Sequence, residues 1–210
     1  AAFADFNTLA VECVADPDSA CLPTVPGLPD DAFEHDGQLT KREIRAATLA
    51  HLAPMPGALL WDVGAGSGSV AIEWMRAARG AKAIAIEVDA ERGERIAANA
   101  MTLGTPTLEI RHGEAPLALE GLDAPDAVFI GGGVTEVGLF ETAWSALRSG
   151  GRLVANAVTV EGEARLFELR QHFGGELVRM QVSRAEPVGR FSGWKPMMPV
   201  TLWSVRKGFS

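Results

Sequence analysis

The stretch from Leu59 to Trp74 constrains the fold of this chain more than any other. Residues 58–63 are nearly all apolar, as expected of a parallel strand that is covered on both faces, and from Val70 onward the apolar residues follow a helical spacing. Between these segments, residues 64–68 have the sequence Gly-Ala-Gly-Ser-Gly. Glycines let a backbone approach a ligand closely, and the first turn of a helix presents unpaired N–H groups to it. The stretch therefore predicts a strand, a ligand-binding turn and a helix of an α/β fold.

The spacing of the glycines separates two cofactor classes. A dinucleotide-binding turn has the pattern Gly-x-Gly-x-x-Gly, whereas residues 64–68 have Gly-x-Gly-x-Gly, preceded by Asp62. This arrangement resembles the first motif of class I S-adenosyl-L-methionine (SAM) methyltransferases. The resemblance implies that the turn cradles the methionine part of SAM and that Asp62 helps to hold its ammonium group. A tight turn without a ligand and a NAD-dependent oxidoreductase are the less favoured alternatives.

A second carboxylate is expected beside this turn. Residues 81–88 form the next apolar strand, and Glu87 lies at its end, 23 residues after Gly64. A carboxylate at a strand tip can accept hydrogen bonds from both ribose hydroxyls of a nucleoside cofactor. We favour Glu87 over Asp89 for this contact because Glu87 directly follows the apolar run, and a helix over residues 90–103 comes next.

The ends of the next two strands extend the expected site. Residues 108–111 form a third strand, and the loop after it places Glu114 and Ala115 where they can meet the adenine edge of the cofactor. Residues 127–130 form a fourth strand, which three successive glycines at 131–133 follow at the topological switch point. These glycines leave room for a large, flat substrate, or they form a mobile loop.

The rest of the chain completes an α/β fold. Helices are expected over residues 135–147 and up to residue 172, with strands over residues 152–160, 176–183 and 199–206, the last two of which pair antiparallel. Together with the glycine motif, this order resembles a class I SAM-dependent methyltransferase (Rossmann-like) fold, which is the fold class we expect. It has a seven-stranded, mostly parallel sheet with helices on both faces and an antiparallel last strand. The segment 184–198 is long, aromatic and basic, which favours a lid or wall over a simple connection.

A helix is also expected before the first strand. Residues 40–43, with the sequence Thr-Lys-Arg-Glu, fit a capping box, and the apolar spacing continues to Ala53. Lys41, Arg42 and Arg45 cluster at the start of this helix, where the helix dipole disfavours cations. They are either solvated or kept there for an anionic ligand.

The charge of the chain is unevenly distributed. Its net charge is −8, and the first 36 residues hold eight acidic residues and no Lys or Arg, so the remainder carries 19 acidic and 19 basic residues. No basic stripe of the kind that binds nucleic acid is present. No apolar run is long enough to span a bilayer, and the chain opens with no secretory signal pattern. We therefore expect a soluble enzyme with neither a nucleic-acid nor a membrane partner.

The N-terminal region has a composition of its own. Four prolines in residues 16–29 prevent a continuous helix or central strand and indicate a linker. We predict an N-terminal arm over residues 1–29 and a methyltransferase domain over residues 30–210. Cys13 and Cys21 lack metal-ligand partners at a useful spacing, so we expect free thiols in a reducing compartment and no metal site.

Several of these segments together resemble one family. Residues 27–33 (Gly-Leu-Pro-Asp-Asp-Ala-Phe), 39–45 (Leu-Thr-Lys-Arg-Glu-Ile-Arg) and 113–116 (Gly-Glu-Ala-Pro), with the glycine turn and the glycine-capped fourth strand, look like the decarboxylating precorrin methyltransferase family of cobalamin biosynthesis. The likeness covers about residues 27–207. In many bacteria this domain is the C-terminal half of a longer enzyme, and residues 3–10 look like the end of a preceding tetrapyrrole-methylase domain.

The resemblance implies a function and a set of contacts. It implies methylation of carbon 15 of a precorrin with decarboxylation of the ring C acetate, in a cytoplasmic, usually tetrameric enzyme. Another small-molecule methyltransferase of the same class remains an alternative, and no catalytic residue is assigned. The expected cofactor contacts are Thr40, Asp62, Gly64, Ala65, Gly66, Ser67, Gly68, Glu87, Glu114 and Ala115. The expected substrate contacts follow from the charge and position of the residues rather than from the resemblance, and they are Lys41, Arg45, Gly131, Gly132, Arg190, Trp194 and Lys195.

Overall fold

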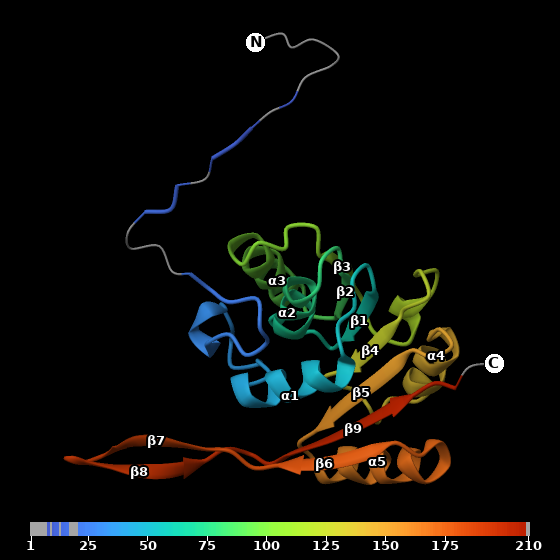
Figure 1. Ribbon diagram of the computed structural model, residues 1–210. Helices are drawn as coiled ribbons and strands as arrows, with labels where there is room; N and C mark the ends of the chain where they lie inside the picture. Colours follow the sequence, from blue (N-terminus) through green and yellow to red (C-terminus); the bar gives the residue numbers. More distant parts are fainter. Residues whose placement is uncertain (1–7, 9, 13, 17–20, 209–210) are drawn as a thin grey trace.

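A seven-stranded sheet forms the centre of the protein (Figure 1). The computed structural model describes residue 8 and residues 10–12, 14–16 and 21–208. The strand order is β3-β2-β1-β4-β5-β9-β6, and β9 alone runs opposite to the other six strands, which confirms the predicted fold class. The strands are β1 (Leu59–Val63), β2 (Lys82–Glu87), β3 (Glu109–His112), β4 (Ala127–Ile130), β5 (Arg152–Ala157), β6 (Glu176–Met180) and β9 (Val200–Arg206).

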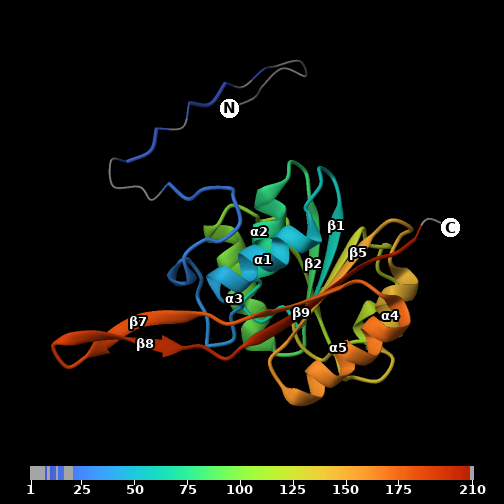
Figure 2. The same ribbon diagram turned by 60° about the horizontal axis from the view of Figure 1, so that its bottom comes forward.

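Helices cover both faces of the sheet (Figures 1 and 2). Side chains alternate between the faces along a strand, so in β1 Leu60 packs into one hydrophobic cluster and Trp61 into the other. The first cluster includes residues of α1, α2 and α3, and the second includes residues of α4 and α5. The helices are α1 (Arg42–Leu52), α2 (Ser69–Ala77), α3 (Ala90–Thr102), α4 (Leu139–Ala146) and α5 (Val160–Phe173), with short 3-10 turns η1 (Asp30–Ala32) and η2 (Leu117–Leu119).

The start of α1 differs from the prediction. Lys41, not Thr40, is the N-cap residue, and no side chain of the expected capping box closes the helix end. Instead the backbone N–H of Arg42 donates to Oδ1 of Asp30 at 2.9 Å. An acidic side chain from η1 thus supplies the acceptor that a local cap would have supplied.

The segment expected to be a lid or wall is a β-hairpin. Strands β7 (Ser183–Val188) and β8 (Phe191–Pro196) pair antiparallel and form a second, two-stranded sheet. The hairpin projects away from the body of the protein (Figure 2). It joins the carboxyl end of β6 to the start of β9, so it leaves the sheet at the carboxyl edge of the parallel strands.

Part of the predicted arm packs against the domain. Leu28 is buried in the first hydrophobic cluster, and Leu22 packs against that cluster. The backbone N–H groups of Gly27 and Leu28 donate to the carboxylate of Glu73. The packed domain therefore begins before residue 30. Cys13, most of residues 3–10 and residues 17–20 lie outside the described residues, whereas Cys21 is a free, exposed thiol.

In the described part of the chain, no helix is both long and apolar enough to cross a membrane. Within the same residues, no group of three or more His, Cys, Asp or Glu side chains is placed to hold a metal ion.

Candidate functional site

The glycine turn between β1 and α2 is tightly packed. Gly64, Gly66 and Gly68 have φ values of 71°, 60° and 76°, a region that side chains rarely adopt. A Cβ on Gly64 would lie 3.1 Å from the backbone nitrogen of Gly132, and one on Gly68 would lie 2.8 Å from Cγ2 of Ile96. The fold itself therefore requires these glycines, and it brings the ends of β1 and β4 into contact.

Asp62 lies buried beneath the turn. Its Oδ2 accepts a hydrogen bond from the backbone N–H of Ala71 at 2.9 Å, while its buried Oδ1 has no hydrogen-bond partner among the residues that the structure describes. Burial raises the pKa of this carboxyl to about 7, with a further upward contribution from the negative charge of Glu87 and an opposing one from the Ala71 hydrogen bond. An unpaired, buried carboxylate oxygen next to the turn fits a cationic or N–H donor group of a ligand.

Glu87 ties the end of β2 to the glycine turn. Its Oε2 accepts from the backbone N–H of Gly66 at 2.8 Å, and its Oε1 accepts from the N–H groups of Val88 and Asp89, each at 3.1 Å. A carboxylate has about four lone-pair positions, so these three bonds leave capacity for about one hydroxyl donor. Asp89 instead caps α3 through the N–H of Arg92. Sequence reasoning missed the structural role of Glu87, and its ribose contact remains a prediction.

A cavity of about 180 Å³ lies at the carboxyl edge of the sheet. It brings together five of the predicted residues, which are Gly64, Glu87, Glu114, Ala115 and Gly132. The other lining residues are Val63, Ile86, Val88, Gly113, Gly133, Glu136 and Leu139. Asp62 and the predicted contacts Thr40, Ala65, Gly66, Ser67, Gly68 and Gly131 are not among the lining residues.

Glu136 is a lining residue that the sequence did not indicate. We expected a helix from residue 135, but α4 begins at Leu139, after Gly138 with a φ of 82°. Residues 133–138 therefore form turns, and these bring Glu136 to the cavity. On the same rim, a Cβ on Gly132 would meet nothing within 4 Å. This side of the cavity is open enough for a second ligand.

Arg45 has a different role from the one expected. It is fully buried, and its Nε lies 2.6 Å from Oε1 of Glu73 while its Nη1 lies 3.3 Å from Oδ1 of Asp30. Its guanidinium group also donates to the carbonyl oxygens of Thr40 and Leu28. The group has no free, exposed donor for a substrate carboxylate, so Arg45 is a structural residue. The sequence could not show this because Glu73 belongs to another helix.

The remaining predicted substrate contacts lie near the same edge or on the hairpin. Lys41 is half-buried at the start of α1. On the hairpin, Arg190 lies 5.0 Å from the ring centre of Phe191, Lys195 pairs with Glu186 at 2.9 Å, and Trp194 is 77% exposed. Arg184 joins the hairpin to η1 and α1 through Asp30 and Glu43 (2.8 and 2.7 Å).

Comparisons with known proteins identify a family. A family model described as a precorrin methyltransferase domain matches residues 31–207. A precorrin-6Y C(5,15)-methyltransferase [decarboxylating] of Sinorhizobium sp is 55% identical over 96% of this chain, which covers 49% of that protein. A "Probable cobalt-precorrin-6B C(15)-methyltransferase (decarboxylating)" of Pyrobaculum aerophilum is 32% identical over 83% of this chain and 93% of its own length.

A solved structure extends the agreement to three dimensions. The crystal structure of the C-terminal domain of precorrin-6Y C5,15-methyltransferase from Rhodobacter capsulatus matches with a TM-score of 0.83 and 48% identity. The match covers 89% of this chain and all of that domain. The chain spans about half the length of the first curated relatives it matches.

A cavity lined by a glycine turn and a strand-tip carboxylate, on this strand order, defines a class I SAM-dependent methyltransferase, and SAM is the cofactor. The orphaned oxygen of Asp62 and the spare acceptor capacity of Glu87 fit that cofactor. Within this class, the chain belongs to the precorrin methyltransferase family.

Proposed function

We propose that this chain carries out SAM-dependent C-methylation of carbon 15 of a precorrin, with decarboxylation of the ring C acetate side chain, in cobalamin biosynthesis. The observation that carries the proposal is the cavity at the carboxyl edge, where Gly64 and Glu87 face Gly132 and Gly133 in a chain of the precorrin methyltransferase family. The printed names of the relatives, which refer to precorrin-6Y and cobalt-precorrin-6B, support this substrate class.

Positioning supplies most of the catalysis of the methyl transfer. SAM supplies an electrophilic methyl group when it is bound. A meso carbon of a reduced tetrapyrrole is already an electron-rich nucleophile, so alignment at near-attack distance removes much of the barrier. The open space beside Gly132 gives a flat macrocycle access to the cavity, and no side chain at Gly64 or Gly132 stands between the two ligands. The site therefore needs no strong base for this step.

The decarboxylation depends on what faces the reacting acetate. A carboxylate in a tight ion pair is stabilised against loss of carbon dioxide, whereas one in an apolar pocket is destabilised. We assign Lys41, Arg190 and Lys195 to the other peripheral carboxylates of the substrate, and the ring of Trp194 or the 131–133 turn to the reacting acetate. The carbon–carbon bond to the carboxyl group breaks, carbon dioxide leaves, and a proton takes its place.

We also infer the oligomeric state and the domain context of the enzyme. It forms a homo-oligomer, a tetramer by resemblance to the family, and it is covalently linked to a preceding tetrapyrrole-methylase domain in a longer protein. The first curated relatives are about twice as long as this chain, which supports the link to a preceding domain. We also infer a cytoplasmic location, which the free, exposed thiol of Cys21 supports because such thiols persist in reducing compartments.

Mass spectrometry of the corrinoid product tests the function. After incubation with SAM and a precorrin substrate, we expect one product that has gained a methyl group and lost carbon dioxide. A methylated product that keeps its carboxyl group would refute the decarboxylation, and an unchanged substrate would refute the function. Glu87→Gln should abolish turnover and weaken SAM binding, whereas Glu91→Gln, a neighbouring exposed carboxylate on α3, should leave both unchanged.

A second pair of variants tests the substrate side. Lys41→Ala should weaken corrinoid binding and spare SAM binding, because its ammonium group is assigned to a substrate carboxylate. The matched control is Lys82→Ala, since Lys82 is an exposed lysine at the amino end of β2, on the opposite edge of the sheet. Equal corrinoid affinity in the two variants would show that Lys41 does not bind the substrate.

A further inference from the structure

One buried amide side chain joins the glycine turn to a segment that precedes β1. Asn99, on α3, is buried. Its Nδ2 donates to the carbonyl oxygens of Ser67 and Glu34 at 3.0 and 2.9 Å, and its Oδ1 accepts from the backbone N–H of Glu34 at 2.8 Å. The peptide group after Ser67 is also held from its other side, because the N–H of Gly68 donates to the carbonyl oxygen of Ala65 at 2.9 Å. Asn99 therefore fixes the turn and the earlier segment at the same time.

Residues 34–38, which we call the strap, lie against the glycine turn. A Cβ on Gly66 would lie 3.2 Å from the carbonyl oxygen of Gln38, so the backbone of the strap packs directly on the backbone of the turn. The strap then leads through residues 39–41 into α1. This close contact and the hydrogen bonds of Asn99 together set the position of the strap on the turn.

Ion pairs hold the exposed side of the strap. Oδ2 of Asp36 lies 2.9 Å from Nε of Arg92 and 3.0 Å from Nη1 of Arg95, and both arginines belong to α3. Nη1 of Arg92 also lies 3.9 Å from Oε1 of Glu87, the carboxylate expected to bind the ribose. The strap is thus attached to α3 by a buried amide and by exposed ion pairs. The ion pairs are the weaker attachment, because solvent screens them.

The glycine turn is the place expected to hold the amino-acid end of SAM. The unpaired oxygen of Asp62 fits its ammonium group, and the N–H groups at the start of α2 fit its carboxylate. Donors and acceptors bind a ligand more tightly when they are held in position before it arrives. A displaced turn or strap would therefore weaken the contacts to the amino-acid end and spare the contact of the ribose with Glu87.

We propose that Asn99 is a positioning residue of the cofactor site, which holds the strap and the glycine turn in the geometry that binds the amino-acid end of SAM. Asn99 acts through the backbone of Ser67 and Glu34 rather than by contact with the cofactor, and Asp36 supports the same geometry from the exposed side of the strap. The proposal rests on the assignment of the amino-acid end to the glycine turn and not on the identity of the methyl acceptor.

Two ligands with the same nucleoside test the proposal by isothermal titration calorimetry on the full chain. S-adenosylhomocysteine carries the amino-acid end, and 5′-methylthioadenosine lacks it. Asn99→Ala should weaken S-adenosylhomocysteine by about tenfold and leave the affinity for 5′-methylthioadenosine within about twofold of the wild type. The control is Thr105→Val, which removes a buried hydrogen bond just after α3 and should change neither affinity. Equal losses for the two ligands in Asn99→Ala would mean a general loss of structure and would overturn the proposal.

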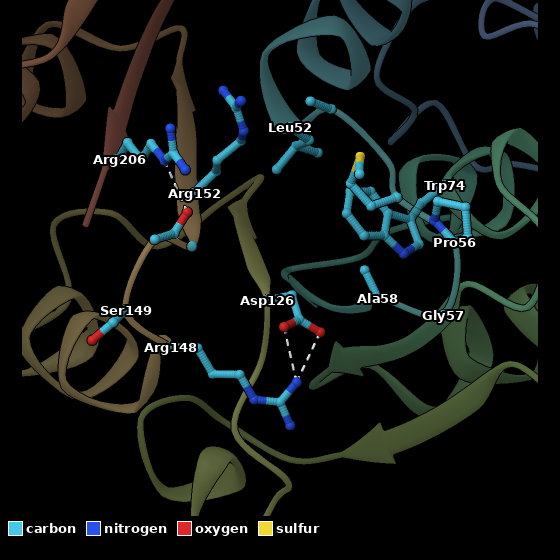
Figure 3. A pocket seen from close by; sticks show the side chains of 14 residues that line it. Leu52, Pro56, Gly57, Ala58, Trp74, Asp126, Arg148, Ser149, Arg152 and Arg206 are labelled. Atoms are coloured by element: carbon cyan, nitrogen blue, oxygen red, sulfur yellow. Dashed lines mark hydrogen bonds and ion pairs between the residues drawn. The ribbon is translucent and has the colours of Figure 1, made fainter. Parts of the chain in front are cut away.

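Asp36→Asn tests the exposed side of the strap, where the change leaves folding intact. It should weaken S-adenosylhomocysteine by a few-fold, less so at high salt, and spare 5′-methylthioadenosine. The matched control is Asp126→Asn, because Asp126 is 35% exposed against 31% for Asp36 and both its oxygens lie 2.9 Å from Nη1 of Arg148. This pair lies in a cavity of about 570 Å³ at the amino edge of the sheet, opposite to the cofactor site (Figure 3), so its loss should change neither affinity.

The remaining outcomes separate the positioning role from the cofactor assignment. A loss for both ligands in Asp36→Asn would mean that Asp36 acts through Arg92 and Glu87, and it would overturn the role given to the strap. Wild-type binding of S-adenosylhomocysteine without a selective loss in either variant would overturn the positioning role alone. If the wild type binds neither ligand, the cofactor assignment is wrong as well.

Discussion

The sheet body and the β7–β8 hairpin are held in different ways. All four residues of β4 are buried, whereas most residues of β7 and β8 are exposed, including Phe191 and Trp194. The body is stabilised by burial on both faces of the sheet. The hairpin has one ladder of backbone hydrogen bonds and the ion pairs of Arg184 at its base. A hairpin of two strands contributes little stability of its own.

The two arginines that share Asp30 make this contrast concrete. Arg45 has 0% of its side chain exposed and pairs with Glu73 inside the body, while Arg184 has 40% exposed and attaches the hairpin. Removing one partner of a buried pair leaves an uncompensated buried charge, whereas an exposed pair is screened by solvent. Residues of the body should therefore control stability, whereas residues of the hairpin should contribute to substrate binding more than to stability.

Breaking the buried ion pair should have the largest effect. Arg45→Met leaves the carboxylate of Glu73 buried and without its guanidinium partner, so we expect a loss of about 3–5 kcal/mol in the free energy of unfolding. Urea denaturation measures it. The control is Arg184→Met, for which we expect a loss below about 1 kcal/mol. Similar losses in the two variants would contradict the division between body and hairpin.

Asp62 provides a test that depends on pH. The raised pKa, about 7, means that the native protein binds more protons than the unfolded chain from about pH 4 to pH 7, so this group lowers stability as pH rises across that range. Asp62→Asn should therefore be as stable as the wild type near pH 3.5 and more stable at pH 8, by at most about 4 kcal/mol. Urea denaturation of the cofactor-free protein at several pH values measures the difference.

The matched control for this experiment lies on the hairpin. Glu186 is a partly exposed carboxylate that pairs with Lys195, so Glu186→Gln should change stability little at any pH. A difference between Asp62→Asn and the wild type that stays constant from pH 3.5 to pH 8 would show that burial does not perturb the pKa of Asp62.

The sequence predicted the body well because burial leaves a pattern. Strands covered on both faces read as apolar runs, and the predicted fourth strand over residues 127–130 matches β4. The glycine turn and Glu87 were found for the same reason, since both directly follow such runs. Of the predicted cofactor contacts, Gly64, Glu87, Glu114 and Ala115 line the cavity.

The sequence failed where the outcome depends on contacts between distant segments. Arg45 looked like an exposed helix-start cation, and its partner Glu73 is 28 residues away. The acceptor for the first N–H of α1 comes from Asp30 rather than from Thr40, and no local sequence pattern indicates that the cap comes from a distant residue. The hairpin was missed because its strands are exposed on both faces, so residues 183–196 lack the alternation that reveals a half-buried strand.

Substitutions at two glycines compare the cost of backbone strain in the sheet body and in the hairpin. Gly68→Ala places a side chain at a φ of 76° and 2.8 Å from Cγ2 of Ile96, so we expect a loss of about 2–3 kcal/mol from strain and overpacking together. Gly189→Ala in the hairpin turn has a φ of 59° and open space around it, so only the strain remains, about 1 kcal/mol. Thermal unfolding measures both. An equal loss would mean that the Ile96 contact relaxes without cost.

The smallest effect on stability is expected for the most exposed aromatic residue of the hairpin. Trp194→Ser should change the free energy of unfolding by less than about 0.5 kcal/mol, because its ring is 77% exposed and buries little surface in the isolated chain. The same variant should weaken corrinoid binding and leave SAM binding unchanged, because the hairpin leaves the sheet at the edge that holds the cofactor cavity. Phe167→Ser, on α5, removes another exposed aromatic residue and should alter neither corrinoid binding nor SAM binding. Stability loss without loss of corrinoid affinity in Trp194→Ser would mean that the ring belongs to the packing of the domain, and the contrast between a stabilising body and a binding hairpin would then fail.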